Sequence, residues 1–448
     1  METNQPEVSV VSGQPSAPQT GSATPERVPF AASRHEIIAA LLLYPLAYGY
    51  VSQWASYSSA EMKLLLAGFT IGFVALTELL HRGVPRKQES WVWLGCALAN
   101  LLSLLADRGQ VWGDSTYAFL HIFAVWWVLS RSDTLLEGGS GHLLPLDALD
   151  GFVLFPFRHF FLRLRTIGFA LSRLRGKRKK PEAETVVWSA VMSAAALGLL
   201  VWAANLLISA DSGFAALLSE VVRLFRFEWD IDVTEFTGRF LLSLPVGAYL
   251  YGLLGGARRE DKAALRRRSG AIAEQMEALR GVPERVWLVL MALFCALYAL
   301  FFAVQGQYLF GAFAGAPAEG FSVAEYARQG FFELCKVMAV NFALLWLVTR
   351  SSREDVRRQK ALRALCLTLL AESFLLAVVA FSKLALYISC FGFTPKRLQS
   401  TWLVCVLAFG CGCAAWSLAA REPSESGGRV FRVWMYFGAV TLSLLSLY

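Results

Sequence analysis

Charged residues are scarce in this sequence. Asp, Glu, Lys and Arg make up 17% of its 448 residues, whereas hydrophobic residues make up 56%. Soluble domains contain about 25% charged residues, so this composition excludes an ordinary soluble protein. The scarcity of charge instead indicates a chain that lies largely in a membrane.

The sequence signatures of soluble enzymes are also missing. The chain contains no GxxxxGK[ST], HExxH or GxSxG motif, and its five His residues are scattered rather than paired. The eight Cys residues lie in or at the ends of apolar stretches, where cysteine behaves as a small hydrophobic residue. We therefore expect no metal and no cofactor. His121 lies within an apolar stretch, and a hydrogen bond to a neighbouring hydroxyl is a simpler role for it than a proton relay.

Long apolar stretches dominate what the sequence does contain. Each is near the ~20 residues that a helix needs to cross ~30 Å of hydrocarbon. The stretches are 36–55, 62–80, 90–106, 115–130, 186–209, 239–256, 286–309, 330–349, 363–388, 398–419 and 430–448. They predict an all-α, polytopic transmembrane helical bundle with about 11 spans.

The positions of the basic residues predict the orientation of the chain. Alternate loops carry 32 of the 42 Lys and Arg residues, and the loops on the other side carry eight. Because cytoplasmic loops are enriched in Lys and Arg, we expect the N-terminus inside and the C-terminus outside. The net charge of +8 is then explained by loops that face anionic lipid, so no nucleic-acid partner is expected.

The chain divides into four parts by composition. Residues 1–34 are polar, lack the apolar core of a cleavable signal peptide and predict a disordered cytoplasmic tail. Residues 35–135 contain spans one to four, residues 136–185 form a basic cytoplasmic segment, and residues 186–448 contain spans five to eleven. Apolar residues at helical spacing around 214–225 suggest a further helix along the outer surface.

The basic segment mixes aromatic and positively charged residues. It is too charged to span a membrane and too apolar for a free loop, which is typical of an amphipathic interfacial helix. Its basic residues are expected to face anionic phospholipid headgroups, with a partner-binding surface as the alternative. These residues are Arg158, Arg163, Arg165, Arg173 and Arg175.

Polar residues gather in and beside the seventh to tenth apolar stretches. They are Gln305, Gln307, Tyr308, Glu325, Tyr326, Arg328, Glu333, Lys336, Asn341, Glu372, Lys383, Tyr387, Thr394 and Arg397. Glu372 is the most costly of them, because a carboxylate near mid-membrane is unfavourable by several kcal/mol unless it is protonated, paired or wetted. Glu333 and Lys336 are three residues apart and can pair on one helix face. Two explanations remain open: ion pairs that fix helix packing, or the lining of a water-filled cavity that opens outward.

The same region resembles a known family. The residues Gln307 to Gly311, the EYAR and GFFEL run from Glu325 to Leu334, Ser382-Lys383, and the FGFT turn at 391–394 carry the likeness. They resemble the bacterial multi-pass membrane family catalogued as domain of unknown function 4173, with its sister 4153, over about 290–415 and more loosely over 140–290. Lys383 stands where the pattern usually has Arg, which argues against a bidentate contact there. The resemblance implies a bacterial cytoplasmic-membrane protein and brings no established activity.

Three functions are compatible with these features. The leading hypothesis is binding or transport of a small polar or charged solute through an outward-facing site, coupled to protonation of Glu372. The alternative is a non-catalytic scaffold that assembles with a membrane-protein partner. A third hypothesis is an intramembrane enzyme on lipid-linked material, which needs a catalytic pair such as Glu325 with Arg328 or Glu372 with His121. We also expect the antiparallel eighth and ninth spans to bring 325–333 and 383–397 together.

Overall fold

The structure is a bundle of long helices. This computed structural model describes residues 30–54, 59–174, 233–310, 323–420 and 426–448 and single positions between 188 and 202. Within these ranges the only extended pairing is a bridge between Val282 and Ser352. The long helices of the described ranges are α1 (Arg34–Gln53), α2 (Ser59–Leu80), α3 (Gln88–Leu105), α4 (Ser115–Ser132), α10 (Val233–Arg259), α12 (Glu284–Phe310), α13 (Val323–Ser351), α14 (Lys360–Phe391), α15 (Pro395–Ala419) and α16 (Ser426–Ser446).

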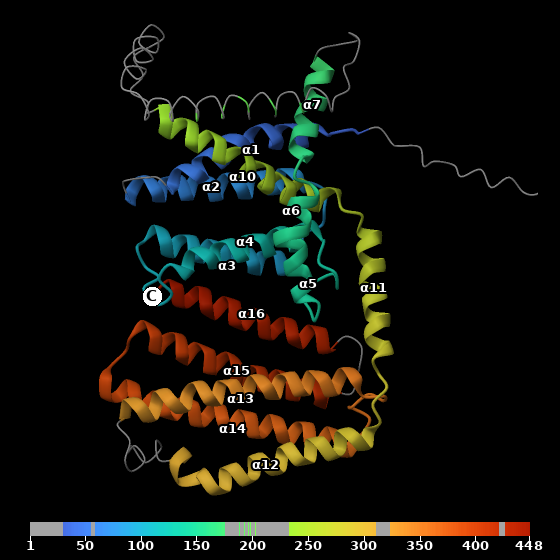
Figure 1. The fold of residues 1–448 in the computed structure, drawn as a ribbon, viewed down its shortest axis with the longest axis vertical. Helices are drawn as coiled ribbons and strands as arrows, with labels where there is room; N and C mark the ends of the chain where they lie inside the picture. The colour runs from blue at the N-terminus through green and yellow to red at the C-terminus, as the bar shows by residue number, and fades with distance from the viewer. Residues whose placement is uncertain are drawn as a thin grey trace, which may run out of the picture.

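Figure 1 shows these helices with their axes nearly aligned, while shorter helices run crosswise over one end. The crosswise elements are α5 (Leu144–Leu149), the π-helical turn η1 (Asp150–Leu154), α6 (Phe155–Arg158), α7 (Leu162–Leu174) and α11 (Lys262–Ala278). We call this end of the bundle, which carries α5 to α7 and α11, the basic end. The C-terminus lies at the opposite end (Figure 1).

Local sequence explains where individual helices begin. Ser33 and Glu36 form a capping box at the start of α1, in which the Ser33 hydroxyl accepts from the Glu36 N–H at 3.2 Å and the Glu36 carboxylate accepts from the Ser33 N–H at 2.7 Å. Between α14 and α15 the chain turns at Gly392, whose φ of +76° favours glycine. Pro395 then begins α15, a position that needs no N–H donor.

Six of the described helices are long and apolar enough to cross a membrane: α2, α10, α12, α13, α14 and α15. Together with the all-helical architecture, they identify a multi-pass membrane protein. The stretches expected at 36–55, 90–106, 115–130 and 430–448 are helical as α1, α3, α4 and α16 but less apolar. The stretch 186–209, apart from single positions, and the helix expected at 214–225 lie outside the described residues. The count of about 11 spans and the N-in orientation stay predictions.

The helices pack around two hydrophobic cores. The first contains buried residues of α1 to α4, α10 and α16, and the second those of α12 to α15. α16 contacts both α3 and α15, so the C-terminal helix joins the two halves. α10 packs with the first four helices, whereas α16 contacts α3 of the first group and α15 of the second.

The basic segment is docked on the ends of neighbouring helices. α6 and α7 pack on α10, and α7 also contacts α1. Gly252 of α10 allows this approach, because a Cβ there would lie 2.4 Å from the Pro156 carbonyl oxygen. Arg268 joins α11 to the same segment by donating to both carboxylate oxygens of the buried Asp150, at 2.8 and 2.9 Å.

The expectation that Arg163 faces phospholipid headgroups is wrong. Its side chain is buried, donates to the Ala40 carbonyl oxygen of α1 at 3.0 Å and lies over the Tyr44 ring. The amphipathic pattern was correct, but the face that carries Arg163 packs on α1. Arg158 and Arg173 are exposed, although Arg158 pairs with Glu260 at 2.8 Å.

Arg165 is exposed as well. Arg175 lies outside the described residues. Contact of the exposed arginines with lipid stays a prediction.

Candidate functional site

A polar network crosses the second core at the junction of three helices. The Tyr298 hydroxyl of α12 donates to the Asn341 side-chain oxygen of α13 at 2.6 Å. The Asn341 amide nitrogen donates to the Ser373 hydroxyl of α14 at 2.8 Å. At 1.5 Å per residue, all three positions lie about 15–21 Å from the basic ends of their helices, near the middle of the bundle.

On α14 the network ends at a backbone carbonyl. Ser373 donates its own hydroxyl hydrogen to the Leu369 carbonyl oxygen, one turn earlier on α14, at 2.8 Å. Asn341 and Ser373 therefore each accept one hydrogen bond and donate one between the Tyr298 hydroxyl and the Leu369 carbonyl, and this order fixes the orientation of the Asn341 amide. Asn341 and Ser373 are buried, and these bonds satisfy polar groups that would be costly in an apolar interior.

Glu372 lies beside this network but does not complete it. Its carboxylate contacts the thiol of Cys295 on α12, and it interacts electrostatically with the Tyr298 hydroxyl. The carboxylate oxygen Oε2 is buried and makes no hydrogen bond within the described part of the chain. A buried carboxylate oxygen without a donor is unfavourable unless the group takes up a proton or a ligand.

A second polar layer lies nearer the opposite end of the bundle. Lys383 of α14 is fully buried, and its charge interacts with that of Glu333 on α13. Glu333 and Lys336 are themselves exposed, and among the described ion pairs there is none between them. The Glu333–Lys336 pair that the spacing allowed is absent from the described ion pairs, and Glu333 interacts electrostatically with Lys383 on the neighbouring helix.

Arg397 caps the end of α14. Its guanidinium donates to the Phe391 carbonyl oxygen at 2.8 Å and also to that of Gly392, and it stacks over the Tyr387 ring at 4.1 Å. The last carbonyls of a helix lack intrahelical donors, so a cation there is stabilising. Tyr387 and Arg397 thus form a structural corner, beside which Thr394 is the residue before α15.

The remaining sequence candidates are placed less fully. Gln305 is exposed near the end of α12. Gln307 and Tyr308 lie in the last turns of α12, and Glu325, Tyr326 and Arg328 in the first turns of α13. The side chains of these five residues lie outside the described part of the structure, so their role stays a prediction.

The catalytic pair of Glu372 with His121 is excluded by the packing. Glu372 lies on α14 of the second core, whereas His121 lies on α4 of the first. His121 Nδ1 is 2.7 Å from the Tyr117 carbonyl oxygen and therefore donates, so Nε2 accepts from the Tyr50 hydroxyl at 3.0 Å. The expected bond to a neighbouring hydroxyl is confirmed. In the described ranges no group of three or more His, Cys, Asp or Glu residues is arranged to hold a metal.

A family model described as Domain of unknown function (DUF4153) matches residues 69–448. The chain belongs to this family. The match falls on the family expected as the sister and not on 4173, which corrects that part of the expectation. It extends well upstream of 290–415 and includes helices of both cores. No curated protein and no solved structure matches the chain.

Sequence reasoning missed three members of the site in this DUF4153 chain. Tyr298 resembles the many other aromatic residues of apolar helices, and Cys295 was interpreted as a small hydrophobic residue. Ser373 directly follows Glu372 but carries no charge to attract attention. A usable signal was the depth of Tyr298, because a tyrosine far from both helix ends needs a hydrogen-bond partner inside the bundle.

Proposed function

We propose that this protein binds and moves a small polar or charged solute across a bacterial cytoplasmic membrane, with the protonation of Glu372 coupled to that movement. The observation that supports the proposal is the buried carboxylate oxygen Oε2 of Glu372, which has no hydrogen-bond donor among the described residues. It lies beside the network of Tyr298, Asn341 and Ser373, whose hydrogen bonds are complete. The N-in orientation with about 11 spans is part of the same proposal.

The energetics favour a functional role for Glu372 over a structural one. A carboxylate at this depth is unfavourable by several kcal/mol when it is ionised and unpaired. Tyr298, Asn341 and Ser373 already connect the three helices without it. A hydrophobic residue at 372 would therefore serve packing better, and the acid is explained by a proton or a cationic group that it takes up in part of a cycle.

The second polar layer suggests the route. Glu333 and Lys383 lie between the mid-bundle network and the end of the bundle that is opposite the basic end. With the N-terminus inside, this end faces outward. A solute would enter from that side, meet opposite charges at Glu333 and Lys383, and reach Glu372 at mid-membrane.

A non-catalytic scaffold is the alternative, and a different observation favours it. Many polar side chains of this bundle are used as caps or as helix-to-helix bonds, as Arg397 and Asn341 are. In a scaffold, Glu372 would be one more packing contact, and its removal would affect assembly or stability only.

Replacing Glu372 by glutamine separates the two functions. The full chain is purified in detergent, and proton uptake in weakly buffered solution is measured as small ammonium, carboxylate and phosphate compounds are added. For a solute site, the wild type releases or takes up protons with one class of compound, whereas Glu372→Gln does not and unfolds at nearly the same denaturant concentration. Glu354→Gln, an exposed change in the loop between α13 and α14, is the control.

A loss of stability without proton exchange would instead support the scaffold. If Glu372→Gln greatly lowers the stability while proton exchange is absent from both the wild type and the variant, the carboxylate is a packing group and the scaffold is correct.

A further inference from the structure

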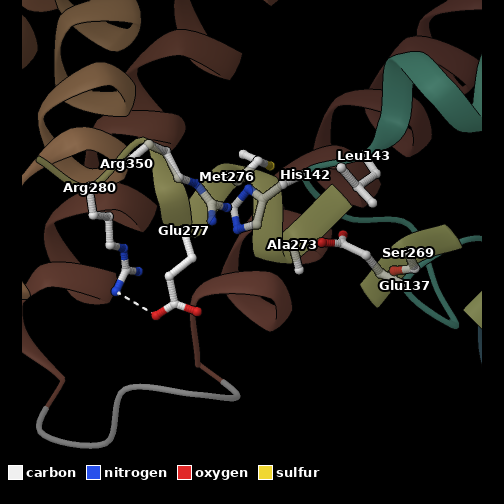
Figure 2. Close-up of a pocket in the computed structure, with 9 residues that line it drawn as sticks. All are labelled: Glu137, His142, Leu143, Ser269, Ala273, Met276, Glu277, Arg280 and Arg350. Carbon is white, nitrogen blue, oxygen red and sulfur yellow. Dashed lines mark ion pairs between the residues drawn. The ribbon is translucent and has the colours of Figure 1, made fainter. Parts of the chain in front are cut away.

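A pocket at the basic end lies between the two halves of the molecule. It encloses about 210 Å³, which is small compared with sites for drug-sized ligands and suits a headgroup-sized molecule. Its walls come from the loop between α4 and α5, from α11 and the connection that follows it, and from the last turn of α13 (Figure 2). The charged residues in these walls belong to neither polar layer of the candidate site.

The central groups of the pocket are Arg350 and His142. Figure 2 shows them beside each other, with Arg280 and Glu277 on one side and Glu137 with Ser269 on the other. Arg350 is half-buried, and it makes no hydrogen bond or ion pair with the described residues. Five guanidinium N–H groups without an acceptor in a partly buried site are costly, so Arg350 is suited to an anionic oxygen from outside the chain.

The surroundings of His142 favour its neutral form beside this arginine. Burial lowers the pKa of His142, and the charge of Arg350 lowers it further, whereas Glu137 raises it. A neutral imidazole can donate a hydrogen bond to the same anionic oxygen without adding charge. Arg280 is less available, because it already pairs with Glu277 at 3.8 Å.

Glu137 supplies the opposite charge. Its carboxylate makes no hydrogen bond with the described residues, and it faces the pocket near the Ser269 hydroxyl (Figure 2). Arg350, Glu137 and His142 interact electrostatically with one another. Apart from the paired Arg280 and Glu277, the pocket therefore presents the cation of Arg350 and the anion of Glu137, with the His142 imidazole between them.

We propose that this pocket binds a phosphate ester that also carries a primary ammonium group. Arg350 and His142 hold the phosphate oxygens, and Glu137 with Ser269 accepts the ammonium hydrogens. A quaternary ammonium is excluded from the second contact, because it has no N–H to donate. Arg350 of the pocket lies at the end of the candidate membrane span Phe331–Ser351, and Leu143, Met276 and Ala273 in the pocket wall suit the glycerol and upper chain of a lipid.

The test compares lipids that share a phosphate but differ in the amine. The full chain is reconstituted in nanodiscs, and the retention of phosphatidylethanolamine, phosphatidylcholine and phosphatidylglycerol is measured by native mass spectrometry. We expect phosphatidylethanolamine to bind about tenfold more tightly than either other lipid, the effect of one charge-assisted contact. Equal retention of all three lipids, or preference for phosphatidylglycerol, would overturn the proposal.

Three substitutions connect the binding to the named residues. Arg350→Gln should weaken phosphatidylethanolamine binding about tenfold or more, and Arg353→Gln, which removes the same charge outside the pocket, should leave it unchanged. Glu137→Gln should remove the preference for ethanolamine over choline while phosphate binding persists. Glu137 is exposed, so this variant is expected to fold even if Arg350→Gln does not. Equal effects of the Arg350 and Arg353 variants would refute the assignment.

Water-soluble phosphoethanolamine distinguishes the two sources of the ligand. If it displaces the lipid and shows the same variant pattern in detergent without lipid, the ligand is a soluble ester. If it does not compete, the ligand is a lipid of the inner leaflet. If the lipid proposal fails, the proposed role of Glu372 is not affected, because the two sites use different residues and are tested by different measurements.

Discussion

Replacing Asn341 by leucine removes both hydrogen bonds that connect α12, α13 and α14. Asn341 accepts from Tyr298 at 2.6 Å and donates to Ser373 at 2.8 Å, and it is 3% exposed. Hydrogen bonds between membrane helices contribute about 0.6 kcal/mol on average and about 1.7 kcal/mol at most. Two such bonds predict a loss of roughly 1–3 kcal/mol in the free energy of unfolding.

The assay is equilibrium unfolding of the full chain in mixed micelles with increasing SDS. Tyr298→Phe and Ser373→Ala each remove one end of the network, and the double variants with Asn341→Leu measure the coupling between the partners. Because Ser373 keeps its bond to the Leu369 carbonyl after Asn341 is lost, Ser373→Ala should be less costly in that background than in the wild type.

Asn100→Leu in the first core is a matched control. Asn100 is also buried, but among the described residues it makes one bond to another helix, to the Ser443 hydroxyl at 3.0 Å. We expect it to be less destabilising than Asn341→Leu. If both changes cost the same, or if the changes at Tyr298 and Asn341 are simply additive, the directed network from Tyr298 to Leu369 does not stabilise the bundle and the reasoning fails.

Two further predictions concern the basic end. Arg131 is 4% exposed, pairs with Glu78 at 3.1 Å and donates to the His81 and Val84 carbonyl oxygens in the turn after α2, so Arg131→Met should destabilise the protein by about 3 kcal/mol. Arg86 pairs with Glu78 at the surface, so Arg86→Met should cost under about 1 kcal/mol, and equal denaturation midpoints for the two variants would contradict this. Burial raises the pKa of Asp147, the Leu136 N–H lowers it, and the charges of Asp150, Glu137 and Glu89 raise it, which together leave the pKa at about 7. The folded state then holds a proton that the unfolded chain releases near pH 4, so wild-type stability falls as the pH rises from about 4 through 7, by at most about 4 kcal/mol. Asp147→Asn should flatten this dependence in melting curves and be more stable than the wild type at pH 8; a slope that persists would assign it to another group.

The positions of the helices were largely predictable from sequence. The stretches expected at 330–349 and 363–388 correspond to α13 (Val323–Ser351) and α14 (Lys360–Phe391). Hydropathy finds such helices because each apolar stretch must satisfy its backbone internally in lipid. Hydropathy underestimates the lengths of these helices, since polar residues such as Lys360 continue the helix beyond the apolar stretch.

Contacts between distant helices were not predictable in this way. Asn100 and Ser443 are 343 residues apart, yet they bond across α3 and α16. Nothing in the local pattern of α16 indicates that it packs with the first core. For the same reason the side of α7 that carries Arg163 resembled a lipid-facing surface, because amphipathic periodicity does not distinguish a lipid surface from another helix.

Within the candidate site, charge and depth in the sequence identified the residues that are unfavourable to bury, but not whether their hydrogen bonds are complete. Glu372 and Arg397 were both selected as polar groups near apolar stretches. In the structure Arg397 uses its N–H groups on the carbonyls at the end of α14, whereas Glu372 keeps a buried oxygen without a donor. A polar group whose bonds are complete is explained by the fold itself. One whose bonds are incomplete is a reason to look for a ligand.

By that criterion α13 connects the two proposed sites. It carries Asn341 beside Glu372 at mid-bundle and Arg350 in the pocket at the basic end. Nine residues separate them, which is about 14 Å along one helix. A ligand that holds Arg350 fixes the end of α13, and any shift of α13 along α14 would break the Asn341–Ser373 bond next to the carboxylate. Occupancy of the pocket is therefore expected to change the proton exchange of Glu372, because both depend on the position of the same helix.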